Sequence, residues 1–307
     1  MILCVSLSPC LETNFEVDSL SVGKMHKVIN RRTFFTGKAM NVATGLSRLG
    51  AHAVVSGFMY EDNGRLFEHE MHKEGVTYKF VWNSGRVKEV YKFIDRRSML
   101  TEVVDEATPI DGENAQKLLE TVADVSKNCN AVIFSGDVTD GLPADYMKQV
   151  LNRVPENVLK IVDTDGHRLA DLLECGLDLV KPNTDELYRA TGIKITDRDS
   201  MLRACENLIE RGAKRVLLSL GKDGAVICDG SRRLYCTTLN VAMNSTAGAG
   251  DAMVAAAAKA LSEGADLADI LRSGVAAGTA SVTLPDSISF LKEKYEEVLQ
   301  TVTVKEI

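Results

Sequence analysis

Short apolar runs rich in β-branched residues alternate with amphipathic helical segments along most of this 307-residue chain. Within the segments 112–127 and 197–211, apolar residues recur every three or four positions, which is typical of helices. Strands that are apolar throughout and separated by helices predict a mostly parallel sheet with both faces covered. We therefore expect a doubly wound α/β fold with helices on both faces and a ligand site beyond the carboxyl ends of the strands. The expected strands are 1–7, 52–58, 130–136, 159–164, 177–182, 215–221 and 224–229.

Two segments do not follow this alternation of apolar strands and amphipathic helices. Residues 12–35 and 79–105 alternate apolar and polar positions and carry basic clusters, a pattern typical of antiparallel strands. We expect them to form one small β-sheet, a lid beside a core made of 1–11, 36–78 and 106–307. Because small open sheets rarely stand alone, the exposed face of the lid could equally be the interface of a homodimer.

Composition excludes several classes of protein. The net charge of −7 argues against a nucleic-acid binder, whose contact surface is usually basic. No apolar run approaches the roughly 18 residues that a membrane span needs, and the start of the chain lacks the basic region of a signal peptide. The seven cysteines are scattered without a C-x-x-C pair, and the five histidines lack zinc-site spacing. We therefore expect a reduced, cytoplasmic protein without nucleic-acid or membrane partners.

The segment STAGAGD (245–251) places Gly248, Ala249 and Gly250 before Asp251, at the start of an alanine-rich stretch. Small residues at a helix N-terminus let backbone N–H groups approach an anion, usually a phosphate. A plain tight turn with Asp251 as a helix cap is the alternative. No Lys follows the glycines, so the segment is not a P-loop. An acid at this point suits contact with a hydroxyl that attacks phosphorus, while the N–H groups hold the developing charge. The segment therefore favours phosphoryl transfer to an alcohol.

Together with several other segments, this loop resembles the ribokinase-like (PfkB) carbohydrate kinases. The other segments, in the order of that family, are 36–50 (TGKAMNVATGLSRLG), 57–64 (GFMYEDNG), 162–166 (VDTDG), 180–187 (VKPNTDEL), 219–225 (SLGKDGA) and 276–283 (AAGTASVT). LSPCLE (7–12) and TEVV (101–104) resemble the tagatose-6-phosphate kinase and 1-phosphofructokinase branch. The resemblance implies an ATP-dependent sugar kinase that acts on a hydroxyl of a hexose phosphate.

The resemblance also implies a role for individual residues. Asp251 would be the catalytic base, and the backbone of Gly248, Ala249 and Gly250, with the Asp251 N–H, would form the anion hole. Asn183, Ser219, Gly221 and Gly224 would bind ATP. Asn183 and Glu186 would orient Mg²⁺ through water, although a helix-capping acid is the alternative for Glu186. The residues expected to bind the acceptor are Glu12, Lys27, Thr36, Gly37, Lys38, Asn41, Arg86 and Asp137. For Asn41 the alternative is a plain helix cap, and for Lys38 a solvated lysine.

The chain departs from the family pattern on the acceptor side. Thr36 and Ala39 replace glycines, and Glu12 replaces an Asp. Asp137 stands where the branch has a Ser that helps to hold the acceptor's phosphate, and a carboxylate there would repel a dianion. The basic lid residue of the branch corresponds to Arg86 only if a short insertion is allowed.

Three functional hypotheses therefore stay open. The first is a hexose-phosphate kinase with a rearranged pocket that uses Lys27, Lys38 and Arg86. The second is a kinase of an unphosphorylated sugar or nucleoside-like acceptor, in which Asp137 and Glu12 bond hydroxyls. The third is a sugar or nucleotide sensor on the same fold, although a sensor would be expected to lose Asp251. A dehydrogenase is disfavoured because no G-x-G-x-x-G follows the first strand. The sequence leaves open the acceptor sugar, the hydroxyl phosphorylated, effectors, and whether the lid closes, dimerises or both.

Overall fold

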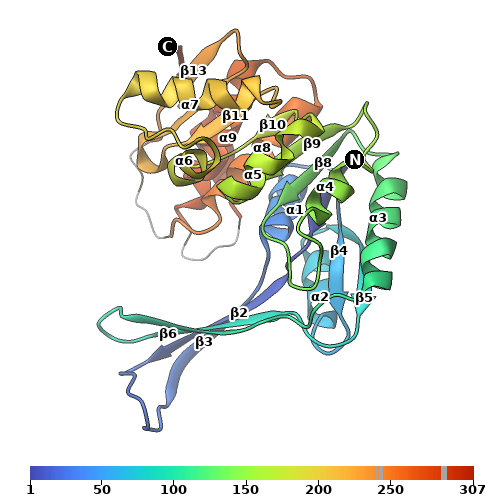
Figure 1. The fold of residues 1–307 in the computed structure, drawn as a ribbon. Coiled ribbons are helices and arrows are strands. Elements are labelled where there is room, and N and C mark those ends of the chain that lie inside the picture. Colours follow the sequence, from blue (N-terminus) through green and yellow to red (C-terminus); the bar gives the residue numbers. More distant parts are fainter. Residues whose placement is uncertain (240, 242–244, 285–288) are drawn as a thin grey trace.

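A computed structural model describes residues 1–239, 241, 245–284 and 289–307. The main sheet has the strand order β14-β13-β12-β11-β10-β9-β8-β1-β4-β5 (Figure 1). The seven strands from β11 to β5 in this order run parallel to one another, and β12, β13 and β14 pair in antiparallel fashion at the other edge. The strands of this sheet are β1 (Ile2–Ser6), β4 (Ala53–Tyr60), β5 (Thr77–Asn83), β8 (Ala131–Ser135), β9 (Leu159–Asp163), β10 (Leu179–Val180), β11 (Val216–Ser219), β12 (Ala225–Cys228), β13 (Arg233–Cys236) and β14 (Val304–Glu306). The predicted α/β fold is confirmed.

Helices cover both faces of this sheet. One layer contains α1, α8, α9 and α10, and the other contains α3 to α7, each packed against the next (Figure 1). The helices are α1 (Lys38–Arg48), α2 (Arg65–Lys73), α3 (Gly112–Ser126), α4 (Tyr146–Leu151), α5 (Gly166–Leu172), α6 (Thr184–Thr191), α7 (Arg198–Glu210), α8 (Ala249–Ser262), α9 (Leu267–Ser281) and α10 (Lys292–Leu299). Every residue of β1, β4 and β8 is buried, as expected of strands covered on both sides. Across the described residues, no helix combines the length and the apolar character that spanning a membrane would require.

The small sheet projects from one end of the core (Figure 1). It has the order β3-β2-β6-β7, with β2 (Cys10–Val17), β3 (Val28–Thr36), β6 (Lys88–Ile94) and β7 (Leu100–Asp105). Its two central strands, β2 and β6, pair in parallel, whereas we expected antiparallel strands throughout. Because β2 and β6 are distant in sequence, no hairpin forces them to run in opposite directions.

Residues 79–83 belong to β5 at the edge of the main sheet rather than to the small sheet. Their alternating pattern arises because the two faces of this edge strand are covered unequally. Val81 and Asn83 are buried, whereas Phe80 and Trp82 are half-buried on the other face, where Arg65 of α2 stacks over the Trp82 ring. An edge strand of this kind alternates like a lid strand, so the sequence pattern could not separate the two.

Helix α8 lies between α1 and α9 and packs through very small side chains. A Cβ atom added to Gly45 of α1 would lie 2.8 Å from the Cβ of Ala255, and one added to Gly278 of α9 would lie 3.4 Å from the carbonyl oxygen of Ala249. The alanine-rich sequence is therefore required by close helix packing. Because α1 and α8 approach so closely, their N-terminal ends lie side by side.

Gly166 offers a test of the packing between α5 and α6. A Cβ atom at this position would lie 2.1 Å from the carbonyl oxygen of Glu186. We expect Gly166→Ala to lower the free energy of unfolding by about 1–3 kcal/mol because the helices must separate. Gly112 is the matched control, since it also begins a helix and a Cβ there meets nothing within 4 Å. Gly112→Ala should be neutral or stabilising by about 0.4–1 kcal/mol. Urea denaturation measures both, and equal values for the two variants would contradict the predicted clash.

Candidate active site

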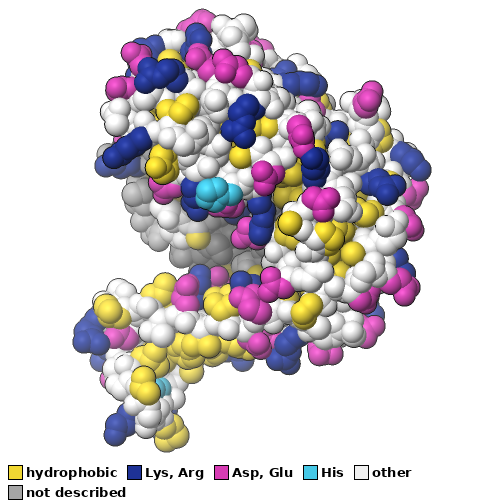
Figure 2. Space-filling view, viewed as in Figure 1, with side chains coloured by type: hydrophobic (Ala, Val, Ile, Leu, Met, Phe, Trp, Pro, Cys, Tyr) yellow, Lys and Arg dark blue, Asp and Glu magenta, His cyan; other side chains and the backbone are white. Residues whose placement is uncertain are grey.

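A cavity of about 940 Å³ lies beyond the carboxyl ends of β9, β10 and β11, next to the N-terminal ends of α1 and α8. Figure 2 shows the hollow that separates the lid from the rest of the molecule. Most of the residues predicted from the sequence line this one cavity, although they come from distant parts of the chain. They are Glu12, Thr36, Gly37, Lys38, Asn41, Asn183, Glu186, Ser219, Gly221, Gly224, Gly248, Ala249, Gly250 and Asp251.

Asp251 is the third residue of α8, and its side chain is buried at the cavity wall. The helix cap is Gly248, with a left-handed φ of 80°. The Ala249 N–H donates to the carbonyl oxygen of Thr246, and no side chain of the described residues bonds to the N–H groups of this first turn. Asp251 is therefore not a capping acid. Instead, its Oδ2 accepts a hydrogen bond of 2.8 Å from the Nδ2 of Asn41. This bond joins the first turns of α8 and α1, so Asn41 orients the carboxylate and is not a helix cap.

The surroundings of Asp251 favour its protonated form. Burial, and next the negative charge of Asp163, raise the pKa of the Asp251 carboxyl to about 7 from its ordinary value of 3.8. The Asn41 amide and two lysine ammonium groups oppose this effect only in part. A carboxylate that titrates near neutral pH is well suited to exchange a proton with a hydroxyl group.

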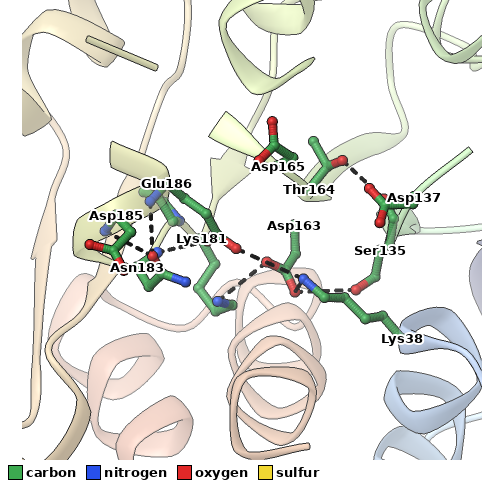
Figure 3. A network of polar contacts seen from close by, with 12 residues as sticks. Lys38, Ser135, Asp137, Asp163, Thr164, Asp165, Lys181, Asn183, Asp185 and Glu186 are labelled. Atoms are coloured by element: carbon green, nitrogen blue, oxygen red, sulfur yellow. Dashed lines mark hydrogen bonds and ion pairs between the residues drawn. The ribbon is translucent and has the colours of Figure 1, made fainter. Parts of the chain in front are cut away.

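An ion pair that was not predicted from the sequence lies beside this carboxylate. The Nζ of Lys181 is 3.3 Å from the Oδ1 of Asp163, without hydrogen-bond geometry, and both side chains are almost completely buried. The Asp163 Oδ2 accepts a hydrogen bond of 3.2 Å from Ser135 (Figure 3). A Cβ on Gly250 would lie 3.3 Å from the Lys181 Nζ, so this ammonium group lies against the first turn of α8. The segments VDTDG and VKPNTDEL contain the pair, but only the fold brings its members together.

Lys38 lies near several carboxylates. Its Nζ is 3.8 Å from the Oδ2 of Asp163 and 4.0 Å from the Oε1 of Glu186 (Figure 3). Burial alone would lower the pKa of the Lys38 ammonium, but nearby carboxylates raise it above its ordinary value. They belong to Asp163, Asp251, Glu186 and Asp137. Lys38 therefore keeps its positive charge among these carboxylates, while its side chain remains 41% exposed.

Glu186 caps helix α6 and also reaches the cavity. Its Oε2 accepts a hydrogen bond of 2.8 Å from the backbone N–H of Asn183, which completes a capping box at the start of α6. Its Oε1 is the Glu186 oxygen nearest to Lys38 and lies at the cavity.

Among the described residues, no group of three or more His, Cys, Asp and Glu side chains is arranged to hold a metal ion. A cation here could take only one or two direct protein ligands.

Three of the predicted acceptor residues do not line the cavity. Lys27 is exposed in the lid just before β3. Arg86 is half-exposed, and its Nη1 is 3.4 Å from the Oδ2 of Asp105. Asp137 is largely exposed and accepts a hydrogen bond of 2.9 Å from the Nη1 of Arg168, a residue of α5.

Two of the acceptor residues that do line the cavity already have partners. The Oε2 of Glu12 is 2.8 Å from the Nζ of Lys92, which belongs to the neighbouring lid strand β6. The Thr36 hydroxyl donates to the carbonyl oxygen of Cys10, at the base of the lid. The added side chain at Thr36 is therefore used to join two lid strands.

The far end of the cavity is less polar. Leu239, Val275 and Val282 contribute apolar surface there, beyond the turn that follows β11. Thr279 of α9 also lines this part, and its buried hydroxyl has no partner among the described residues. Thr279 lies within the segment AAGTASVT, but its role was not predicted. A flat aromatic group with polar edges would match this mixture of surfaces.

The comparisons with known proteins agree with this geometry. The model of the pfkB family carbohydrate kinase matches residues 2–294. The chain is 28% identical to the 1-phosphofructokinase of Borreliella burgdorferi over 92% of this chain and 91% of that protein. It is 22% identical to the tagatose-6-phosphate kinase of Staphylococcus epidermidis over 100% of both chains.

A solved structure extends the similarity to the fold. The tetrameric inhibited form of phosphofructokinase-2 from Escherichia coli superposes with a TM-score of 0.87 at 24% identity, over 97% of this chain and 98% of that one. The relatives named as kinases transfer phosphoryl groups to sugar hydroxyls, as the sequence predicts for this chain. Since the family model covers nearly the whole chain, this protein belongs to the pfkB family of carbohydrate kinases.

Proposed function

We propose that this protein transfers the γ-phosphoryl group of ATP to a hydroxyl of a hexose phosphate, as a kinase of the 1-phosphofructokinase or tagatose-6-phosphate kinase type. The observation that carries this proposal is the buried Asp251 carboxylate, which Asn41 fixes at the open N-terminus of α8. The names of the two relatives support the choice of a hexose phosphate.

In the proposed reaction, Asp251 accepts the proton of the acceptor hydroxyl while the hydroxyl oxygen attacks the γ-phosphorus. The bond between this phosphorus and the bridging oxygen of ADP breaks, and ADP leaves. The backbone N–H groups of Gly250 and Asp251 have no acceptor among the described residues, so they are available to the transferring group. The Lys181 ammonium lies beside Gly250 and adds a positive charge there.

The cavity fits Mg²⁺ bound through few protein ligands. The Oε1 of Glu186 is not used in the capping box and lies at the cavity, and the side chain of Asn183 is adjacent. Magnesium keeps several waters and is commonly held by one or two carboxylates together with substrate phosphates. When bound, it would neutralise phosphate charge. Ser219, Gly221 and Gly224 would lie along the nucleotide.

The lid supports a proposal about assembly. The outer face of its sheet carries Phe15, Tyr91 and Phe93, whose rings stack with centroid distances of 5.2 and 6.5 Å. Figure 2 shows apolar side chains along the lid surface that faces away from the cavity. An open four-stranded sheet gains stability when it packs against a partner. We propose that a second copy of the chain covers this face.

The seven thiols, none in a disulfide, suit an assembly in a reducing cytoplasm.

Asp251→Asn tests the base. We expect kcat to fall by about 100-fold or more because the acceptor proton then has no carboxylate to receive it. ATP affinity should be retained, as measured by calorimetric titration. Asp199→Asn is the matched control, since Asp199 is also an acid in the first turn of a helix and is exposed. Turnover of the Asp251→Asn variant at the wild-type rate would remove Asp251 from this role.

The pH dependence follows from the raised pKa of Asp251. The base must be ionised, so we expect kcat/KM to rise about tenfold per pH unit below about pH 7 and to level off above it. Asp163→Asn removes a neighbouring negative charge and should move this inflection to lower pH. A pH profile that is flat through this range would be inconsistent with the assignment.

Stability provides a second measurement of the same pKa. Because the folded state holds the Asp251 proton more tightly than the unfolded chain, its stabilising contribution is present at acid pH and is lost as the pH rises. Relative to Asp251→Asn, the wild type should lose about 1.4 kcal/mol per pH unit between about pH 5 and pH 7, and no more above. Denaturant titrations at several pH values measure this difference.

Two adjacent residues of β7 test the proposed dimer. Val103 lies opposite Tyr91 on the outer face, whereas Val104 lies opposite Val90 on the face towards the cavity, and the two are similarly exposed. We expect Val103→Arg to weaken dimerisation at least about tenfold because it buries an unpaired charge at the interface. Val104→Arg should leave it unchanged. Analytical ultracentrifugation decides the question, and a monomeric wild type or dissociation by Val104→Arg alone would contradict the proposal.

A further inference from the structure

A surface ion pair lies beside the acceptor end of the cavity. Asp137 follows Gly136 at the carboxyl end of β8, and a Cβ on Gly136 would lie 3.6 Å from the Cβ of Lys38. Thr164 fixes this turn, since its hydroxyl donates to the carbonyl oxygen of Gly136 at 2.9 Å. Figure 3 shows Asp137 on the same side of the polar network as Ser135 and Lys38. The Arg168 guanidinium that bonds Asp137 does not itself line the cavity, but the turn at Gly136 places the pair beside Lys38, which does.

Arg168 has unused hydrogen-bonding capacity. A guanidinium has five N–H donors, and the bond to Asp137 occupies one of them. None of the other four finds an acceptor within the described part of the chain. Its side chain is 42% exposed, and the Asp137 side chain is 71% exposed. This arginine can therefore donate to a bidentate partner from solvent without first being uncovered, whether beside Asp137 or in its place.

Three other cations near the cavity already have carboxylate neighbours. Lys181 is buried against Asp163, and Lys38 lies between Asp163 and Glu186. In the lid, Lys92 contacts two carboxylates, those of Glu12 and Glu102. Arg168 has a single partner among the described residues, the mostly solvated carboxylate of Asp137.

We infer that Arg168 binds the phosphate group of a phosphorylated sugar acceptor, and that Asp137 holds its guanidinium in place until the phosphate displaces the carboxylate. This inference rests on the proposed kinase function and names the group that would make the enzyme prefer a sugar phosphate over a free sugar. It also assigns a purpose to Asp137, which by itself would repel a dianion.

The exchange of partners is physically favourable. An exposed ion pair between Asp and Arg is weak because water screens both charges. A phosphate dianion can instead accept two parallel N–H bonds from a guanidinium, which are shorter and stronger than neutral hydrogen bonds. The displaced Asp137 carboxylate is already largely in contact with water, so it loses little when Arg168 leaves it.

Arg168→Gln tests this inference. With fructose 1-phosphate, tagatose 6-phosphate and fructose 6-phosphate as probes, we expect the KM of the phosphorylated substrate to rise about 10-fold to 100-fold, with kcat nearly unchanged. The KM of the free sugars fructose and tagatose, where turnover is detectable, should not change. The KM of Arg168→Lys for the phosphorylated substrate should lie between those of the wild type and Arg168→Gln. An ammonium group keeps the positive charge but lacks the planar pair of N–H donors that binds a phosphate in bidentate fashion.

Arg189→Gln is the matched control. Arg189 is similarly exposed and also pairs with one carboxylate, since its Nη1 donates to the Oδ2 of Asp165 at 3.0 Å, while its Nε donates to the carbonyl oxygen of Asp185. This variant should keep the wild-type KM for every acceptor. Thermal unfolding of all three variants checks that α5 remains folded. Calorimetric titration of the sugar phosphates without nucleotide gives an affinity that does not depend on turnover.

The outcomes separate this inference from the proposed function. If the wild type phosphorylates a sugar phosphate and Arg168→Gln keeps its KM, the inference is overturned while the kinase function stands. An equal rise in KM for phosphorylated and free sugars would also overturn it, because Arg168 would then act by positioning Asp137. If no sugar phosphate is turned over, the proposed function fails, and calorimetric binding that is lost in Arg168→Gln would still support the inference.

Discussion

The contact between α1 and α8 sets the distance between the two helix N-termini on which the active site is built. Gly45 and Ala255 meet so closely that a Cβ on Gly45 would lie 2.8 Å from the Ala255 Cβ. At this separation the Asn41 amide can reach the Asp251 carboxylate, which lies 210 residues further along the chain. A larger side chain at the contact would move α8 away and break this bond. The alanine-rich sequence of α8 is therefore a requirement of the chemistry as well as of the core.

The buried charges near this contact depend on one another. Asp163 and Lys181 could not be buried singly, because an isolated charge in a dry interior is very costly. Their pairing places a carboxylate near Asp251 and an ammonium beside Gly250. The first raises the pKa of Asp251 towards neutrality, and the second adds positive charge where the N–H groups of α8 are open. One ion pair thus affects both the proposed base and the proposed anion hole.

Local sequence signals predicted the parts of the fold that depend on local patterns. The seven expected strands are present, and Asp251, Asn183 and Glu186, which short ordered segments with their own turn or cap pointed to, all line the cavity. Contacts between distant segments could not be predicted in this way. The bond from Asn41 to Asp251 and the pair of Asp163 with Lys181 arise only when strands and helices from different parts of the chain are packed together.

Two of the departures from the family pattern gain a physical account once their partners are known. Glu12 is held by Lys92 from the adjacent lid strand, and Asp137 is held by Arg168 from α5. In each case a cation on a neighbouring element offsets the carboxylate. An Asp and Arg pair has the same net charge as the serine that it replaces, so the acceptor end need not repel a dianion. Unlike a serine, the pair also brings a guanidinium with free donors. Read alone, Asp137 argues against a phosphorylated acceptor, but Asp137 together with Arg168 favours one.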